Sequence, residues 1–381
     1  MKRNTILPFF SGILLPLFLT AAFLAATIVG CAGDATSPGN KEEEEVEESS
    51  RKDLKCEKEK NPAEKNNSTE NGVGEEIEPL DYEKHQPNEL GDIMILMYHV
   101  IGDEEGTWER TRENFRQDLS RLYEKGYRPV NLMDAVQGEM NLPPGKSPVV
   151  LTFDDGTEGH FGYVEKDGEK IIDPDSAVGI LLDKEEKYED FEAAGTFFVN
   201  YLPVPFRNEE YYEEKIAHLH ELGFEIGNHG YNHKNLAHKS PEEIQEELGR
   251  HQKYTESIIP DYHVESLALA FGVWPQNEDY REYVFTGEYQ GVEYQHKAVL
   301  NVGANPANSP FHKDFNPLDL PRIRADQERM DQWLEYYENN PHKRYVSDGR
   351  QNVITFPKNK EDKLATDWKE SDKEIDAYKL D

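Results

Sequence analysis

From about residue 92 onward, apolar and polar positions of this chain follow two alternating patterns. Short apolar runs typical of buried strands lie at 93–98, 128–132, 149–153, 195–199, 224–227, 267–271 and 298–302. Between them, stretches with helical spacing lie at 111–125, 133–136, 211–222 and 241–258. This repeated alternation predicts an α/β fold, with a parallel sheet or barrel and helices on its outside.

One segment interrupts the alternation, at 158–192, between two strong strand patterns. Its Lys-Asp-Gly-Glu sequence at 166–169 predicts a hairpin turn, and the apolar residues that follow indicate a crossover helix. The segment directly follows an Asp-Asp-Gly sequence at 154–156. We therefore expect it to form a wall of any cleft beside that turn.

The N-terminal region predicts export. Lys2 and Arg3 precede an apolar stretch at 6–29, as in a secretory signal peptide. The stretch ends Ile-Val-Gly-Cys at 28–31 and resembles a bacterial lipobox, which implies a signal peptide at 1–30 and lipidation of Cys31. An uncleaved membrane span is the alternative, because the run is long enough to cross a bilayer. Either anchor places the protein on the extracellular face of the cell membrane.

Residues 31–90 predict a disordered acidic tether, because they are rich in Glu, Lys, Asn and Ser and can bury little apolar surface. Only two cysteines exist; with Cys31 lipidated, Cys56 is alone, so a disulfide within one chain is excluded. The chain has 76 acidic and 42 basic residues, a net charge of −34. That charge argues against nucleic acid as a partner, because phosphates would be repelled.

Two short motifs carry the candidate chemistry. Thr-Phe-Asp-Asp-Gly at 152–156 ends one apolar run, and His-Gly-Tyr-Asn-His at 229–233 follows another. One Asp with two His is a ligand set for zinc or a harder metal, and the second Asp would serve as a base. Gly156 permits a sharp turn, so both carboxylates can enter one cleft. The alternative is a solvated turn and two unrelated surface histidines.

The histidine motif allows two local structures. His229 and His233 could share one face of a helical turn, or both could lie on a loop after the strand. The motif is not the His-Glu-x-x-His helix of zinc proteases, because Gly230 follows the first histidine.

Together these motifs resemble the polysaccharide deacetylase family, the hydrolases with NodB homology. Gly-Thr-Phe-Phe-Val-Asn at 195–200 is similar to a strand that usually lies between them, and the resemblance runs over 93–324. Leu-Met-Tyr-His-Val-Ile at 96–101 comes first, an order closest to that of poly-N-acetylglucosamine deacetylases. The resemblance implies a distorted (β/α) barrel at 91–360, followed by a charged tail at 361–381.

It also implies roles for individual residues. Asp155, His229 and His233 would hold a divalent metal, zinc or another first-row ion. Asp154 would be the base that activates water, and His99 the acid that protonates the leaving amine. Without the family, His99 would be read as a capped histidine at the end of a strand.

The family's third motif, with its Arg or Tyr-Pro pair, is not matched at 267–272. An arginine that orients Asp154 would have to come from elsewhere, and Arg322 and Arg324 are the candidates. Phe271 and Trp274 are candidates to line a pocket for the acetyl methyl group or a sugar face. Core packing is the alternative for Phe271.

These expectations combine into one function: a lipid-anchored, metal-dependent enzyme that removes N-acetyl groups from poly-N-acetylglucosamine or peptidoglycan. Two alternatives stay open. One is a catalytically weak, glycan-binding surface lipoprotein, and the other is an O-deacetylase of an esterified glycan.

Overall fold

The structure, a computed structural model, describes residues 80–380. The predicted signal peptide, the lipidation site at Cys31 and most of the predicted tether lie outside the described residues. Within the described part of the chain, no helix combines the length and apolar character needed to cross a membrane.

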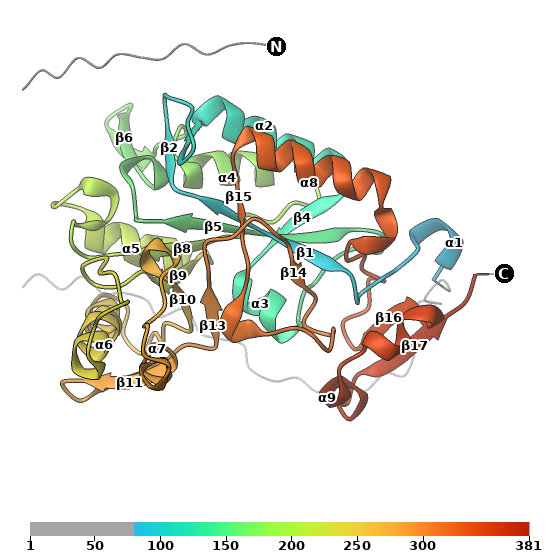
Figure 1. Ribbon diagram of the computed structural model, residues 1–381. Helices are drawn as coiled ribbons and strands as arrows, with labels where there is room; N and C mark the ends of the chain where they lie inside the picture. Colours follow the sequence, from blue (N-terminus) through green and yellow to red (C-terminus); the bar gives the residue numbers. More distant parts are fainter. Residues whose placement is uncertain (1–79, 381) are drawn as a thin grey trace, which may run out of the picture. The chain divides into compact units, whose positions relative to one another are not determined.

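A curled sheet of mostly parallel strands forms the centre of the domain (Figure 1). Its main strands are β1 (Asp92–Tyr98), β5 (Ser147–Asp154), β8 (Thr196–Val199), β9 (Glu225–Asn228), β10 (Ser266–Ala268) and β13 (Ala298–Leu300). The strands β4 (Tyr127–Val130), β14 (Ala307–Asn308) and β15 (Ile323–Arg324) are added at its sides, and β14 is antiparallel to β1. The order runs β13-β10-β9-β8-β5-β1.

The two edges of this order approach one another through the segment before β15. Leu300 of β13 bridges Leu320, and β15 pairs in parallel with β1. The sheet therefore curls into a distorted barrel, and the predicted (β/α) barrel is confirmed.

Helices cover the outside of the barrel. They are α2 (Arg112–Glu124), α4 (Ala177–Lys187), α5 (Tyr212–Glu221), α6 (Pro241–Ile258) and α8 (Gln327–Asn339), and a short α3 (Leu132–Gln137) follows β4. The sequence sets several of their starts: Ser240 and Glu243 form a capping box at α6, and Thr111 caps α2. Apolar stripes of α2, α4, α5 and α8 pack on one large core cluster against the sheet.

The pleat of β5 decides which side chains enter the barrel. Leu151 and Phe153 pack in the outer core beneath the helices, whereas Val150 packs with Phe198 in a second, inner cluster. Successive residues of a strand face opposite sides. By this alternation Asp154 points inward at the carboxyl end of β5.

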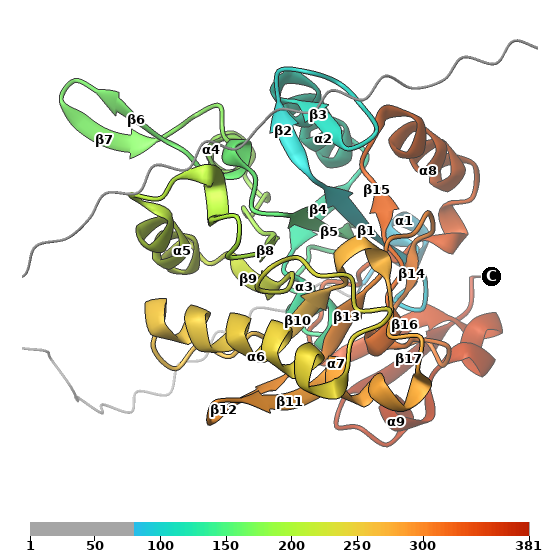
Figure 2. The same ribbon diagram turned by 60° about the vertical axis from the view of Figure 1, so that its left-hand side comes forward.

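The insertion at 158–192 has the predicted parts. After a short turn, β6 (Tyr163–Lys166) and β7 (Glu169–Ile172) form an antiparallel hairpin, and α4 is the crossover helix. Figure 2 shows this hairpin projecting from the barrel on the side of α4 and α5. A second hairpin, β11 (Thr286–Tyr289) with β12 (Val292–Gln295), packs on α6.

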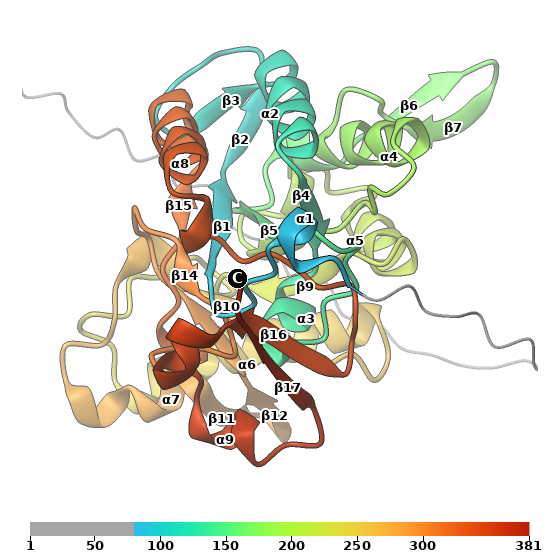
Figure 3. The same cartoon turned by 90° about the vertical axis from the view of Figure 1, so that its right-hand side faces the viewer.

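The domain boundaries need correction at both ends. Residues 361–381 are not simply a charged tail, because β17 (Glu374–Tyr378) pairs in parallel with β16 (Val353–Pro357). The first helix, α1 (Tyr82–His85), falls within the predicted tether, and the ring of Tyr82 stacks on that of Tyr378. Figure 3 faces this side of the molecule. The apolar positions of β17 are few and lie among charges, so the pattern concealed the strand.

Candidate active site

Three predicted metal ligands meet at the carboxyl ends of β5 and β9. Asp155 Oδ1 lies 3.2 Å from His229 Nε2 and 3.3 Å from His233 Nε2. All three donor atoms lie within 4.8 Å of one another. Two imidazole nitrogens and one carboxylate oxygen form a set with open positions, as in catalytic zinc sites. The residues therefore fit a divalent metal.

A tight turn separates the two aspartates. Asp155 has a φ of 74° and Gly156 a φ of 53°, so the chain turns sharply as soon as β5 ends. Asp tolerates this left-handed region better than most residues. The Gly156 carbonyl accepts a hydrogen bond from Phe206 N at 2.7 Å, which secures the turn. Asp154 consequently faces the barrel interior while Asp155 faces the rim.

His229 is held in one tautomer. Its Nδ1 lies 2.8 Å from the carbonyl of Ala268, to which only a protonated nitrogen can donate. The lone pair is then on Nε2, the nitrogen that faces Asp155. Such a carbonyl partner is the usual support for a metal-binding histidine.

His233 lies on a loop, so the helical-turn alternative is wrong. Its φ is 53°, and the loop is fastened by Glu247 of α6, which accepts hydrogen bonds from the backbone of Asn232 and Lys234. Glycine suits position 230, because its φ is 78° and an added Cβ would lie 2.8 Å from the Glu247 oxygen that holds the loop. In the sequence Glu247 resembles an ordinary surface residue of a helix, so no pattern predicts this role.

Asp154 forms a buried, bidentate ion pair with Arg322. Two 2.7 Å hydrogen bonds join the guanidinium to both carboxylate oxygens, and both side chains are at most 1% exposed. Arg322 also donates to Thr152 Oγ1 and to the Asn301 carbonyl. Burial raises the pKa of Asp154, but Arg322 and His229 outweigh it and the net pKa is lowered. Asp154 is therefore ionised at neutral pH.

His99 lies across from this carboxylate, at the end of β1. Its Nε2 is 3.9 Å from Asp154 Oδ2, and its ring packs at 4.7 Å against Trp108. Its Nδ1 has no hydrogen-bond partner among residues 80–380. Burial lowers the pKa of His99, and the charge of Asp154 opposes this only in part. His99 is thus neutral at pH 7 in the free site.

The backbone of His99 is held by the segment that follows the aspartate turn. Its carbonyl accepts hydrogen bonds from Thr157 Oγ1 and from His160 Nε2. His160 is fully buried, and burial lowers its pKa to about 4, so this imidazole stays neutral. Thr157 directly precedes the insertion and His160 lies within it, and nothing in their spacing signals this contact.

The remaining candidates lie in different surroundings. Phe271 is 60% exposed and its ring lies 4.5 Å from that of His233, so it forms part of the rim and not of the core. Trp274 packs in an outer cluster and donates to Asn301 Oδ1. Arg324 pairs with Asp326 and lies over the Trp108 ring, not on Asp154.

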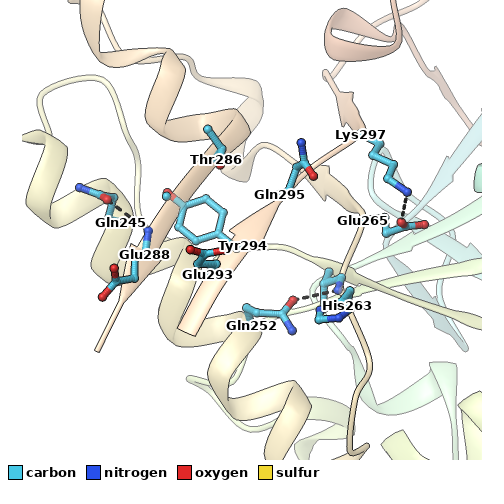
Figure 4. A pocket seen from close by; sticks show the side chains of 12 residues that line it. Gln245, Gln252, His263, Glu265, Thr286, Glu288, Glu293, Tyr294, Gln295 and Lys297 are labelled. Atoms are coloured by element: carbon cyan, nitrogen blue, oxygen red, sulfur yellow. Dashed lines mark hydrogen bonds and ion pairs between the residues drawn. The ribbon is translucent and has the colours of Figure 1, made fainter. Parts of the chain in front are cut away.

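Two cavities lie at opposite ends of the barrel strands. One, of about 690 Å³, is formed at the amino ends of β10 and β13 by the β11–β12 hairpin and α6 (Figure 4). Its polar groups largely pair with one another: Lys297 with Glu265, and Gln252 with the backbone of Val264. The other, of about 650 Å³, begins at Thr157, two residues after Asp155.

One known family matches part of the chain. The family model described as polysaccharide deacetylase matches residues 188–286. This part of the chain is therefore similar to polysaccharide deacetylases, a family of hydrolases. The matched range includes His229 and His233, while the two aspartates, His99 and Arg322 lie outside it. No curated protein matches the chain in sequence.

Several solved deacetylase structures are similar to this chain. The Streptococcus pyogenes deacetylase PplD, in complex with acetate, has 18% identity and a TM-score of 0.46, over 63% of this chain and 97% of that one. A polysaccharide deacetylase of Bacillus cereus has 18% identity and a TM-score of 0.46, over 64% and 69%. IcaB from Ammonifex degensii has 17% identity and a TM-score of 0.43, over 65% and 97%.

Proposed function

We propose that this protein is a metal-dependent N-deacetylase of an extracellular or cell-wall glycan, poly-N-acetylglucosamine or peptidoglycan. Asp155, His229 and His233 would hold the metal, with zinc favoured by the nitrogen-rich donor set and other first-row ions able to replace it. The signal-peptide and lipobox patterns support a location on the outer face of the cell membrane, with Cys31 as the lipid anchor.

One observation carries this proposal. An ionised carboxylate, held by a buried arginine, lies directly beside a three-residue metal set and opposite an imidazole. Hydrolysis of an amide needs an activated water, a stabilised oxyanion and a proton for the nitrogen. A bound divalent metal would supply the Lewis acidity for the first two needs.

Residues of the chain supply the proton transfers. Asp154 is ionised and fixed by two hydrogen bonds to Arg322, so its carboxylate can accept a proton from water without reorienting. His99 delivers a proton to the amide nitrogen as the C–N bond breaks. Because His99 is neutral in the free site, it must first gain that proton, and Asp154 Oδ2 at 3.9 Å is a source within reach of one small movement.

The test is acetate release by the purified full chain, with and without a chelator, on peptidoglycan and on poly-N-acetylglucosamine. We expect release on at least one glycan, its loss with chelator, and its return when zinc is added back. Release that persists in chelator would contradict the metal dependence. No release from either glycan, with binding intact, would favour the glycan-binding alternative.

A further inference from the structure

The insertion forms part of the wall of the cavity of about 650 Å³ beside the candidate active site. Its walls come from residues just after His99, the segment that starts at Thr157, the β6–β7 hairpin and α5. The hairpin and α5 lie on the same side of the barrel in Figure 2. Thr157 lies two residues after Asp155 and donates a hydrogen bond to the His99 carbonyl. The cavity and the candidate catalytic groups therefore share a wall.

A buried lysine lines this cavity. Lys215 of α5 is only 3% exposed, yet its ammonium makes no hydrogen bond or salt bridge within residues 80–380. Its neighbours are the rings of Tyr163 and Phe206, each centred 5.7 Å away. Burial lowers its pKa, and the surrounding carboxylates oppose this only in part. Buried charges are normally paired, so an ammonium on a cavity wall that no carboxylate reaches within ion-pair distance is free to bind an anionic group of a ligand.

Lys184 shows what a satisfied buried lysine looks like in the same protein. It lies on α4, is 8% exposed, and donates to Ser120 Oγ at 2.6 Å. Lys184 does not line the cavity. Lys184 thus donates a hydrogen bond to a protein group, whereas Lys215 donates none within residues 80–380.

The charge of the cavity is also unusual for this protein. Its walls carry four cationic side chains, at Arg112, Lys170, Arg207 and Lys215, against three acidic ones, at Glu158, Glu165 and Asp173. In the whole chain acidic residues outnumber basic ones by 76 to 42. Arg112 and Lys170 pair with Asp103 and Glu214. Three carboxylates, Glu158, Asp173 and Glu214, act on the Lys215 ammonium. The cavity therefore has no cationic surplus, and a single ammonium suits a singly charged ligand better than a dianion.

We infer that this cavity is a subsite for a carboxylate borne by the glycan close to the sugar whose N-acetyl group is removed, with Lys215 as its counter-ion. The inference rests on the proposed function and narrows its substrate class. It favours an acidic strand, such as that of peptidoglycan, over neutral poly-N-acetylglucosamine. The carboxylate can belong to the sugar or to an attached peptide.

The test compares kcat/KM for acetate release by the full chain on three substrates: acidic glycan strands with peptides, the same strands without peptides, and neutral poly-N-acetylglucosamine oligomers of equal length. Lys215→Met removes the charge and keeps the aliphatic volume. We expect the ratio of acidic to neutral kcat/KM to fall about tenfold, as for loss of a hydrogen bond to a charged group. Lys184→Met is the matched control and should keep the wild-type ratio.

The two acidic substrates locate the carboxylate. A fall with both strands assigns it to the sugar, and a fall only with the peptide-bearing strand assigns it to the peptide. An unchanged ratio, or an equal loss on all three substrates, would overturn the subsite. If Lys215→Met does not fold, as shown by thermal unfolding, Lys215→Gln repeats the comparison.

Failure of the proposed function is distinguishable from failure of the subsite. If the wild-type protein releases acetate from no glycan, calorimetry of the acidic strand binding to wild type, Lys215→Met and Lys184→Met decides the subsite without turnover. Weaker binding by Lys215→Met alone supports it. Equal binding by all three proteins overturns it.

Discussion

The two halves of the active site place neighbouring carboxylates in opposite surroundings. Asp154 is 1% exposed and both its oxygens are bound by Arg322, whereas the side chain of Asp155 is 28% exposed and faces two imidazoles. A single positive-φ step at Asp155 produces this difference. A carboxylate whose oxygens are both engaged by one cation is fixed in orientation, while the one on the rim can accept an exchangeable partner. In the function we propose, Asp154 would transfer the proton and Asp155 would bind the metal.

We expect the largest loss of activity from substitution of Asp155, the carboxylate on the rim of the site. Asp155→Ala removes the only carboxylate of the metal set and leaves two histidines, so we expect loss of bound metal and of all measurable acetate release. Metal content by elemental analysis and acetate release check both parts. Retention of stoichiometric metal with lost activity would break the assignment of Asp155 as a ligand.

The interior carboxylate should behave differently. Asp154→Asn keeps the shape of the side chain but removes its basicity, so we expect activity to fall by about 10²–10⁴-fold, the usual contribution of a general base. Metal content should stay at the wild-type level. Equal metal loss in Asp154→Asn and Asp155→Ala would contradict the assignment of Asp155 alone as the ligand and Asp154 as the base.

Arg322 should control the pH dependence of activity, because it lowers the pKa of Asp154. Asp154 acts as a base only when ionised, so activity falls as the pH drops through its pKa. Burial raises that pKa and Arg322 lowers it, so in Arg322→Met the acid limb of the kcat/KM profile should move to higher pH. An unchanged acid limb would show that Arg322 does not control Asp154.

The same substitution leaves a buried carboxylate without its counter-ion, and we expect a loss of about 3–5 kcal/mol in the free energy of unfolding at neutral pH. The Arg322→Met/Asp154→Asn double variant is the control. It should recover much of the stability and none of the activity. Denaturant unfolding of the wild type and of both variants measures this.

The smallest effect is expected at His99, which touches neither the metal set nor Arg322. In His99→Ala we expect amide hydrolysis about 10²-fold slower with metal retained. Hydrolysis of an acetyl ester should suffer less, because an alkoxide leaves more easily than an amine. Unchanged amide turnover would remove His99 from the mechanism, and stronger ester than amide hydrolysis by the wild type would favour the O-deacetylase alternative.

Much of this arrangement follows from local sequence. Apolar runs located the main strands, and the capping residues of α6 fixed its start at Pro241. The spacing of the two motifs at the ends of strands predicted their proximity, because the carboxyl ends of parallel strands meet at one edge of a sheet. The predicted strands at 267–271 and 298–302 end earlier, at Ala268 and Leu300.

The partners that come from distant segments were harder to predict. Arg322 lies 168 positions from Asp154, and sequence alone left it equivalent to Arg324, two residues further on. Strand alternation would place two residues that are two positions apart on the same side, so the pattern cannot separate them. Their partners do, since Arg322 binds Asp154 and Arg324 binds Asp326. Glu247 and His160 act on the site through backbone atoms, which carry no sequence signature. Contacts of this kind are properties of the folded barrel and not of any motif.

The direction of β1 has a consequence for the reach of the enzyme. The chain enters the barrel beside α1, at the Asp92 end of β1, and His99 follows the opposite end of the same strand. In Figure 1 the entry point and the C-terminus lie together at that far end. If the protein is anchored through its N-terminus, as we propose, the candidate active site would lie at the end of β1 opposite to the one where the anchored segment joins the domain. Such an enzyme would act on polymer at some distance from its anchor, and the length of the tether would set the largest distance.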